Sequence, residues 1–482
     1  MKLRWITAVL LLIVGCTVGP DYKPPVAPEI RAPLFVGGSI TTTDSLAFWW
    51  RNFDDPLLTE FVEQGLATSP TVEAAIARLR AARALREGVE GSYWPQFSAD
   101  GSYRWSRDWG DSQSTKKWNE TLNTSADARW EIDLFGSVRR SVEQAEAEER
   151  KLAYTLQDVR VSLAAEIART YVMVRQYQAQ VTLVQTNILL QERNAEMARQ
   201  RYSAQTSTRY DLATAIAQLA RIRASLPALR QSLTEAMLKL DWLTGQVPYA
   251  TQQRISETQD VMCPPSVTPK TLSNELLRRR ADIRVAEESI HAQTAAVGIA
   301  TAEIYPKFYL NGTIGLSAPD IAPLSDYTRN VGFGPSASWN VFGFGTYRKR
   351  IAAAKETLTA TVADYTHTVL QAYQEAEAAW NAYHNEAERT ADLIEAENQH
   401  QIAYDIALRV YKEGEADFSN VISQQGNLLS LQETIATHRA ALFSDVILLY
   451  KTLGGGWADE SATPNEPLVI NPTANSSIPP MK

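Results

Sequence analysis

The chain has 482 residues and a formal net charge of −8, from 47 basic and 55 acidic side chains. This length is enough for two or three domains or for one elongated unit, and the apolar content is enough for a sizeable core. The acidic charge is dispersed along the chain, so nucleic acid is not an expected partner.

Residues 1–15 predict an export signal. Lys2 and Arg4 precede an apolar run that is shorter than the roughly 20 residues needed by a membrane-spanning helix. Ile13-Val14-Gly15-Cys16 resembles the bacterial lipobox, in which the cysteine sulfur receives a diacylglycerol, the signal is cleaved before the cysteine and the new amine is acylated. The alternative is an ordinary secretory signal with a coincidental cysteine.

The sequence thus predicts a lipid anchor on Cys16 and an extended Pro-rich linker over residues 16–50. This covalent lipid, a diacylglycerol thioether plus an N-acyl chain, is the only non-protein group expected, and no cofactor is predicted. Cys263, the other cysteine, then has no partner for a disulfide within the chain.

Several motifs occur twice along the chain. Trp130, Tyr202 and Gly245 recur 209 residues later, at Trp339, Tyr411 and Gly454, and "YWPQF" recurs as "IYPKF". These pairs predict an internal duplication, with a first repeat at 51–245, a linker at 246–272 and a second repeat at 273–455. The polar, Pro-rich tail at 456–482 is expected to be disordered.

Two strands are expected in each repeat. Apolar and polar residues alternate in "FSADGSYRW", in "LNTSADARWEI", in "FYLNGTIGL" and, more weakly, in "VGFGPSASWNVF". Each run has about 10 residues, the length that a tilted strand needs to cross a membrane, although soluble hairpins with one wetted face would show the same alternation. Tryptophans near these runs are candidates for an aromatic girdle: Trp105, Trp109, Trp118, Trp130 and Trp339.

Long helices are expected after each pair of strands. From Ser137 to about Arg201 there is no Pro or Gly, and apolar residues recur at steps of three and four, which predicts a helix about 100 Å long. A second helix follows from about Asp211 to Leu243. The second repeat predicts helices at 346–410 and at about 418–453, joined at Gly414, and Gln205 takes the place of that glycine in the first repeat.

Four strands are too few to close a barrel, and an open sheet edge in lipid would leave backbone groups without hydrogen bonds. Membrane-crossing strands would therefore have to be shared between protomers. Two protomers are the minimum, and three would give twelve strands.

No pattern of catalytic or metal-binding residues is present in the sequence. The five histidines are scattered without the spacing H-E-x-x-H, and we find no nucleophile elbow and no dinucleotide-binding loop. The chain is therefore not expected to be an enzyme or to hold a metal.

Three segments carry a family resemblance: "CTVGPDYKPP", "LLRRRADIRVAEESIHAQTAAVGIATAEIYPKFYLNG" and "RVYKEGEADFSNVISQQGNLLSLQ". They resemble the outer-membrane efflux factors, in particular the NodT-type lipoprotein branch related to OprM and TolC, and the likeness covers nearly the whole mature chain. Ala281 stands where this family usually has proline.

The resemblance implies an α+β membrane protein that forms a homotrimer. Its twelve-stranded β-barrel, with four strands per protomer, would sit in the outer membrane and continue into a long α-helical barrel in the periplasm, with a small mixed domain around the middle. The implied function is the exit channel of a tripartite efflux system, with a periplasmic adaptor and an inner-membrane pump as partners. The alternative is a lipid-anchored periplasmic coiled-coil adaptor, but adaptors lack two sets of alternating strands.

In this family the periplasmic end of the tunnel is closed near the helical turns. By position, the gate candidates are Arg209 and Asp211 in the first turn and Glu415 and Asp417 in the second, and solvated charges without a gating role are the alternative. Only 6 Met and 5 His are present, which favours small organic or drug-like substrates over metal ions.

Overall fold

A computed structural model describes residues 17–26, 46–107, 118–255, 279–318, 327–415 and 417–457. Cys16, Trp109 and Cys263 lie outside these ranges, as do the predicted signal and all but the first two residues of the predicted tail. The predictions for those positions therefore remain predictions.

One series of elements occurs twice along the chain. The first series is α4 (Pro70–Glu90), β1 (Gln96–Ser106), β2 (Asn119–Ile132), α5 (Ser137–Ser203) and α6 (Arg209–Leu243). The second is α9 (Ala281–Ala302), β3 (Lys307–Ala318), β4 (Thr328–Ser338), α10 (Phe344–Glu413) and α11 (Phe418–Thr452). The predicted long helices are confirmed to within three residues at each end. Shorter elements are η1 (Trp49–Phe53), α3 (Pro56–Thr68), η2 (Gly91–Tyr93), α7 (Ala250–Arg254) and η4 (Val341–Gly343).

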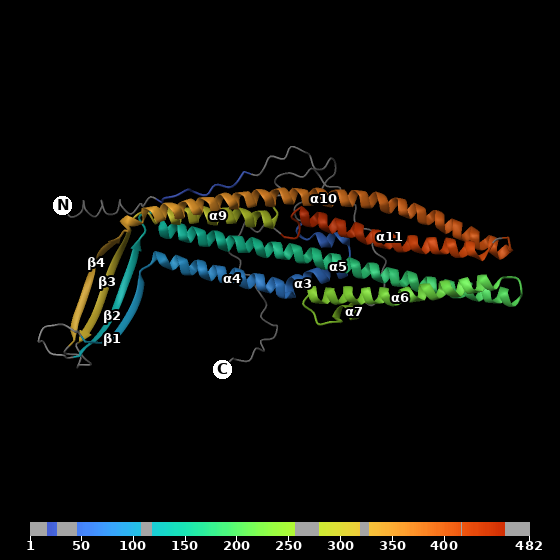
Figure 1. Cartoon of the computed structure of the whole chain (residues 1–482), viewed down its shortest axis with the longest axis horizontal. Helices are drawn as coiled ribbons and strands as arrows, with labels where there is room; N and C mark the ends of the chain where they lie inside the picture. Colours follow the sequence, from blue (N-terminus) through green and yellow to red (C-terminus); the bar gives the residue numbers. More distant parts are fainter. Residues whose placement is uncertain are drawn as a thin grey trace.

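The four strands form one antiparallel sheet in the order β1-β2-β3-β4, at one end of the molecule (Figure 1). The register pairs Ala126 with Ile314 and Ile314 with Val331, so apolar side chains share one face. Ser98, Asp127 and Thr313 are likewise paired across three strands and share the opposite, polar face. Ile314 is 64% exposed and Val331 79%, so the apolar face is uncovered in the single chain.

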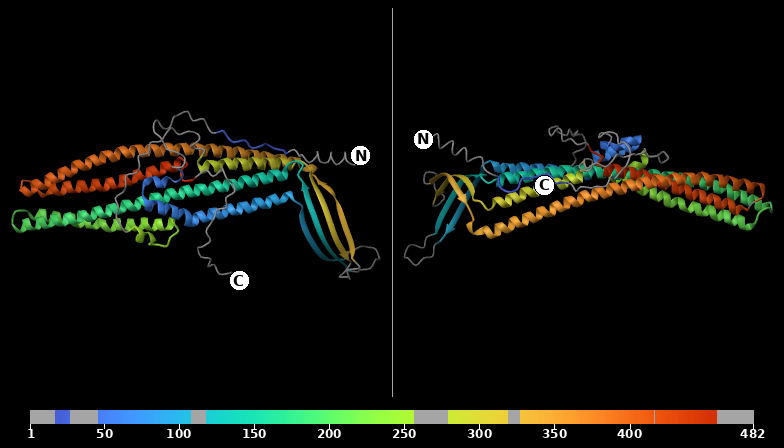
Figure 2. Two further views of the ribbon diagram at one scale, coloured as in Figure 1. Left: turned by 180° about the vertical axis from the view of Figure 1, so that it is seen from behind. Right: turned by 90° about the horizontal axis from the view of Figure 1, so that it is seen from above.

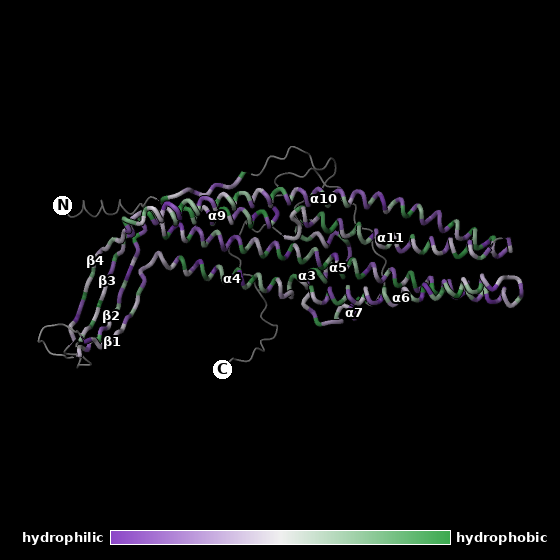
Figure 3. Tube along the Cα trace, viewed as in Figure 1, coloured by the Kyte–Doolittle hydropathy of each residue, from purple (hydrophilic) through white to green (hydrophobic). Residues whose placement is uncertain are grey.

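The helices form an elongated bundle that begins at the sheet (Figures 1 and 2). α5 and α10 run from the sheet to the far end, and the 67 residues of α5 correspond to about 100 Å. α5 contacts α4 and α9 in the half near the sheet, and α6 and α11 in the far half. Figure 3 shows hydrophilic and hydrophobic residues interspersed along both long helices. No helix in the described part of the chain is long and apolar enough to cross a membrane.

A compact layer made of η1 and α3 covers one side of the bundle at its middle. Trp49 stacks on Tyr450 of α11, and Phe53 stacks on Phe443 with 4.5 Å between ring centroids. The buried Tyr171 hydroxyl of α5 donates a 2.6 Å hydrogen bond to Asp55, whose carboxylate also caps α3. The larger of the two hydrophobic cores formed by the described residues lies here, between this layer and the long helices.

Residues 17–26, which we call the strap, lie against α5 and α9 next to the sheet. The Val18 N–H donates to the Phe135 carbonyl at 3.1 Å, and Asp21 forms a 2.6 Å ion pair with the buried Arg140. Tyr22 stacks on His291 of α9 with 4.0 Å between ring centroids. At Gly19, φ is +92° and an added Cβ would lie 2.6 Å from the Gly298 Cα, so only glycine fits this contact. The strap thereby joins the first series of elements to the second.

Candidate functional site

Both helical turns lie at the end of the molecule farthest from the sheet (Figure 1). In the first turn the Gln205 N–H donates to the Tyr202 carbonyl at 3.0 Å, and in the second the Gly414 N–H donates to the Tyr411 carbonyl at 3.1 Å. Gln205 has φ +59° and Gly414 has φ +87°, so both occupy the left-handed region. Gln205 thus adopts the conformation that glycine takes in the second turn, with the strain of a Cβ.

Asp211 is held within its own turn. Its carboxylate accepts hydrogen bonds from the Thr208 backbone N–H at 3.1 Å and from the Ser207 and Thr208 hydroxyls at 2.8 Å, and Thr208 in turn accepts from the Asp211 N–H. This is a capping box that starts α6. Although desolvation acts to raise the pKa of Asp211, these hydrogen bonds outweigh it and lower the pKa. The structure therefore gives Asp211 a capping role, and its gating role remains a prediction.

The other three gate candidates are exposed at the same end. Arg209 is the first residue of α6, where a positive charge meets the unfavourable end of the helix dipole. Asp417 is the N-cap of α11, but its side chain makes no capping hydrogen bond. Glu415 follows the left-handed Gly414. None of Arg209, Glu415 and Asp417 forms an ion pair with another described residue, so their charges are available to groups outside the protomer.

One contact between the two turns was not predicted from the sequence. The Arg201 guanidinium, at the end of α5, lies 4.2 Å from the centre of the Tyr411 ring and donates to the Lys412 carbonyl at 3.2 Å. Tyr411 is buried and packs on Phe418. Tyr411 is recognisable in the sequence as the repeat of Tyr202. The residue of the second repeat that corresponds to Arg201 is Val410, so the arginine is not duplicated and the repeat does not predict this contact.

A buried polar layer joins α5 to α11 further from the tip. The Gln191 and Asn194 side-chain amides both donate to the Gln425 carbonyl oxygen, at 2.7 and 2.8 Å, and all three residues are buried. Such a layer favours one register of the two helices, because a shift would break both of these buried hydrogen bonds. Gln and Asn within long polar helices gave no signal in the sequence.

Four of the five girdle candidates are in the described part of the chain, and they lie at both ends of the sheet. Trp130 and Trp339 donate their indole N–H groups to the carbonyls of Tyr93 and Ile304, each at 2.9 Å, where the sheet meets the helices. Trp105 and Trp118 flank the opposite end and are 67% and 61% exposed. No group of three or more His, Cys, Asp or Glu side chains that could hold a metal ion occurs among the described residues.

Comparison with known proteins identifies the family. The model of the family described as "Outer membrane efflux protein" matches residues 61–246 and 272–455, the greater part of the chain. The chain belongs to this family. It is an outer-membrane efflux channel protein and not an enzyme.

Curated relatives and solved structures agree with this assignment. Nodulation protein T of Rhizobium leguminosarum bv. trifolii is 26% identical over 88% of this efflux protein and 91% of the relative. The toluene efflux pump outer membrane protein TtgC of Pseudomonas putida is 25% identical over 94% and 96%, respectively. The structure of the outer-membrane channel OprN has a TM-score of 0.81 and 32% identity, and covers 92% of this chain and 100% of that one. The Campylobacter jejuni CmeC channel has a TM-score of 0.82 at 19% identity, over 92% of this chain and 96% of that one, which supports the fold alone.

Proposed function

We propose that the protein is the exit channel of a tripartite efflux system, which receives small organic or drug-like substrates from an inner-membrane pump and a periplasmic adaptor. In this proposal the chain forms a homotrimer with a twelve-stranded barrel in the outer membrane and a helical tunnel in the periplasm. Cys16 carries lipid in the same membrane.

The observation that carries the proposal is the open sheet. Among the described residues, β1 and β4 each pair with one strand only, and each presents 11 residues of edge backbone. The sheet also exposes one apolar face, including Phe97, Ile314 and Val331. Pairing β1 of one protomer with β4 of the next satisfies the edges, and lipid covers the apolar face. Sharing among three protomers gives the twelve strands of the proposed barrel.

The outer helices support the same arrangement. α4 packs mainly on α5, and α10 packs mainly on α9 and α11, so each has a side on which no described helix of the same protomer packs. Apolar side chains are exposed there, such as Leu85 of α4 at 71% and Leu370 of α10 at 50%. Helix contacts between protomers would bury these side chains and continue the tunnel wall below the barrel.

The gate of this channel is proposed at the helical tip. Under three-fold symmetry, Arg209, Glu415 and Asp417 would each occur three times around one opening, and ion pairs between neighbouring protomers would hold it closed. The Arg201 contact with Tyr411 would close the same opening from within each protomer.

The proposal is tested by the native mass of the protein extracted from outer membranes in detergent, together with the mass of the acyl groups on each chain. Three protomers that each carry a diacylglycerol and an N-acyl chain are expected. A lipidated monomer would leave the sheet edges unpaired and would favour the periplasmic adaptor instead.

A further inference from the structure

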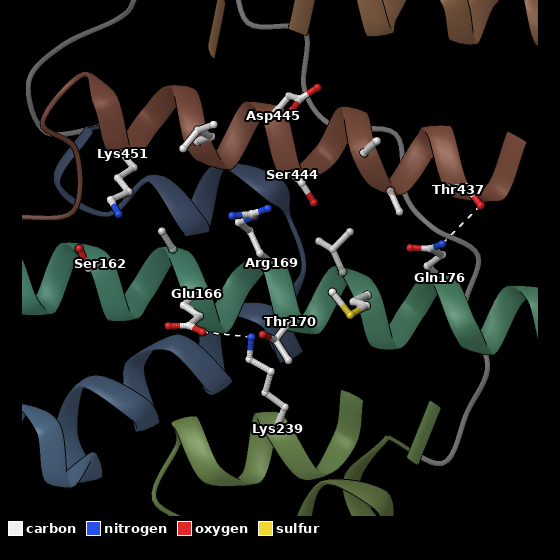
Figure 4. A pocket seen from close by; sticks show the side chains of 16 residues that line it. Ser162, Glu166, Arg169, Thr170, Gln176, Lys239, Thr437, Ser444, Asp445 and Lys451 are labelled. Carbon is white, nitrogen blue, oxygen red and sulfur yellow. Dashed lines mark hydrogen bonds and ion pairs between the residues drawn. The ribbon is translucent and has the colours of Figure 1, made fainter. Parts of the chain in front are cut away.

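A groove of about 540 Å³ lies between α5 and α11, with α6 at its side (Figure 4). We call it the α5–α11 groove. Its lining combines charged, hydroxyl and apolar side chains, among them Glu166, Arg169, Met173, Ser444, Leu448 and Lys451. A volume of this size suits a small organic molecule.

The groove opens on the side of α5 that faces away from the η1–α3 layer. The Tyr171 hydroxyl of α5 donates a hydrogen bond to Asp55 at the start of α3, so Tyr171 faces that layer. Because an α-helix has 3.6 residues per turn, Arg169 and Met173 project from the opposite side of α5. In the proposed trimer the layer surrounds the middle of the tunnel, so the groove lines its lumen. This step rests on the proposed function.

The charges in the groove do not cancel. Glu166 forms a 3.0 Å ion pair with Lys239 of α6, so the charges of these two side chains neutralise each other. Arg169 and Lys451 point into the space between the two helices in Figure 4, and neither forms an ion pair with a carboxylate in the described part of the chain. The carboxylates that act on them from further away are Asp445, which also lines the groove, and Asp158. Beside the Glu166–Lys239 pair, the charged side chains of the lining are Arg169, Lys451 and Asp445, so the groove keeps one net positive charge even with Asp445 ionised.

We propose that the α5–α11 groove is a transit site that binds organic anions, namely carboxylates or sulfonates that carry an apolar body. The planar Arg169 guanidinium can hold two oxygens of such a group, and the nearby Ser444 hydroxyl can donate a further hydrogen bond. Met173 and Leu448 supply a contact surface for the apolar body. An open groove with separated cations favours rapid release, which a transport path requires.

The test is calorimetric titration of the purified full-length trimer with 2-naphthoate and with 2-naphthylmethylammonium, which share an aromatic body and differ in charge. The anion is expected to bind more tightly than the cation. Arg169→Gln should weaken 2-naphthoate binding about tenfold or more, because it removes a charge-assisted contact, and Lys451→Gln should weaken it to a smaller extent, because it lowers only the positive charge of the groove. Arg169→Glu should reverse the preference between the two probes.

Arg193→Gln is the matched control, because it removes the same charge from an exposed position of α5 outside the groove. It should leave the affinity for 2-naphthoate unchanged. Equal binding of the two probes, or an Arg169→Gln variant with full affinity, would overturn the proposal. Conductance in planar bilayers distinguishes failure of the proposed anion site from failure of the proposed function. A trimer that conducts but does not discriminate between the probes refutes the anion site alone. Failure to form channels refutes the proposed function.

Discussion

Arg201 joins the two helical hairpins at the tip by two contacts of different kinds. A guanidinium over an aromatic ring at a partly exposed site contributes about 0.5–1 kcal/mol, and a hydrogen bond from a charged group about 1.5–3 kcal/mol. Both contacts run from α5 to the last turn of α10, and the carbonyl that accepts is at the negative end of that helix. Separation of the hairpin tips must break both.

Arg201→Ala should therefore loosen the closed tip. We expect single channels of this variant in planar bilayers to conduct more often or more strongly than the wild type. Arg199→Ala is the control, since Arg199 pairs at 2.6 Å with Glu196 on its own helix. Identical conductance in Arg201→Ala and wild type would remove Arg201 from the gate.

Asp445 makes stability depend on pH. Burial, and then the nearby Glu386, raise its pKa to about 6, while Arg169 acts in the opposite direction. An aspartate in an unfolded chain has a pKa of about 3.9. Between about pH 4 and 6, the folded state therefore keeps a proton on Asp445 that the unfolded state has released. The free energy of unfolding should accordingly fall as pH rises through this window, by up to about 3 kcal/mol.

Asp445→Asn removes this dependence. We expect the variant to unfold at a higher temperature than wild type at pH 7.5 and at nearly the same temperature at pH 4. Thermal unfolding of trimers in detergent at the two pH values measures this. Asp392→Asn, at an exposed carboxyl of α10, should show no such difference; if the two variants respond alike, the burial of Asp445 is not the cause.

At the scale of elements, the two turns offer a matched pair. Gly414 and Gln205 hold equivalent left-handed positions, but only Gln205 has a Cβ there. A non-glycine residue in this region carries strain of at least about 1 kcal/mol, partly offset by the smaller entropy that it loses on folding.

Gly414→Gln should therefore destabilise the second turn by about 1 kcal/mol, whereas Gln205→Gly should leave the first turn unchanged or slightly more stable. Hydrogen exchange of the amides in the last turns of α5 and α10 reports on this locally. The same response in both turns would contradict the equivalence of the two positions.

The helices and strands were predictable because their signals are local. The alternation of apolar and polar residues in a strand and the apolar stripe of a long helix both depend only on residues that are close in the sequence. The predicted bounds of α5 and α10 therefore agree with the observed bounds to within three residues. The contacts of Arg201 with Tyr411 and of Gln191 with Gln425 join positions more than 200 residues apart, and no periodicity records them. The docking of the strap on Arg140 and His291 likewise depends on which helices become neighbours.

At the scale of the whole molecule, attachment to the membrane is proposed to be double. The strap places Thr17, the residue after Cys16, against Gly136 where the sheet meets α5. An acyl chain on Cys16 would therefore be attached to the protein next to the edge of the proposed barrel. Anchor and barrel would hold the same part of the molecule in the same membrane.

Because the two attachments overlap, Cys16→Ala with a signal of the soluble-protein type should still give some trimers in the outer membrane. The measurement is the amount of trimer in isolated outer membranes relative to wild type. Complete failure to assemble would mean that the lipid is required for insertion rather than for added attachment.

The distribution of helix-breaking residues gives the bundle unequal stiffness. The 67 residues of α5 contain no Gly or Pro, and in α10 the only such residue is Gly345, at its start. The returning helices differ, since α6 contains Pro227 and α11 contains Gly426, where nothing lies within 4 Å of an added Cβ. Sharp bends in helices form at such residues. α5 and α10 would then stay straight and rigid between the membrane and the tip. When the tip widens, α6 and α11 would be the helices that bend.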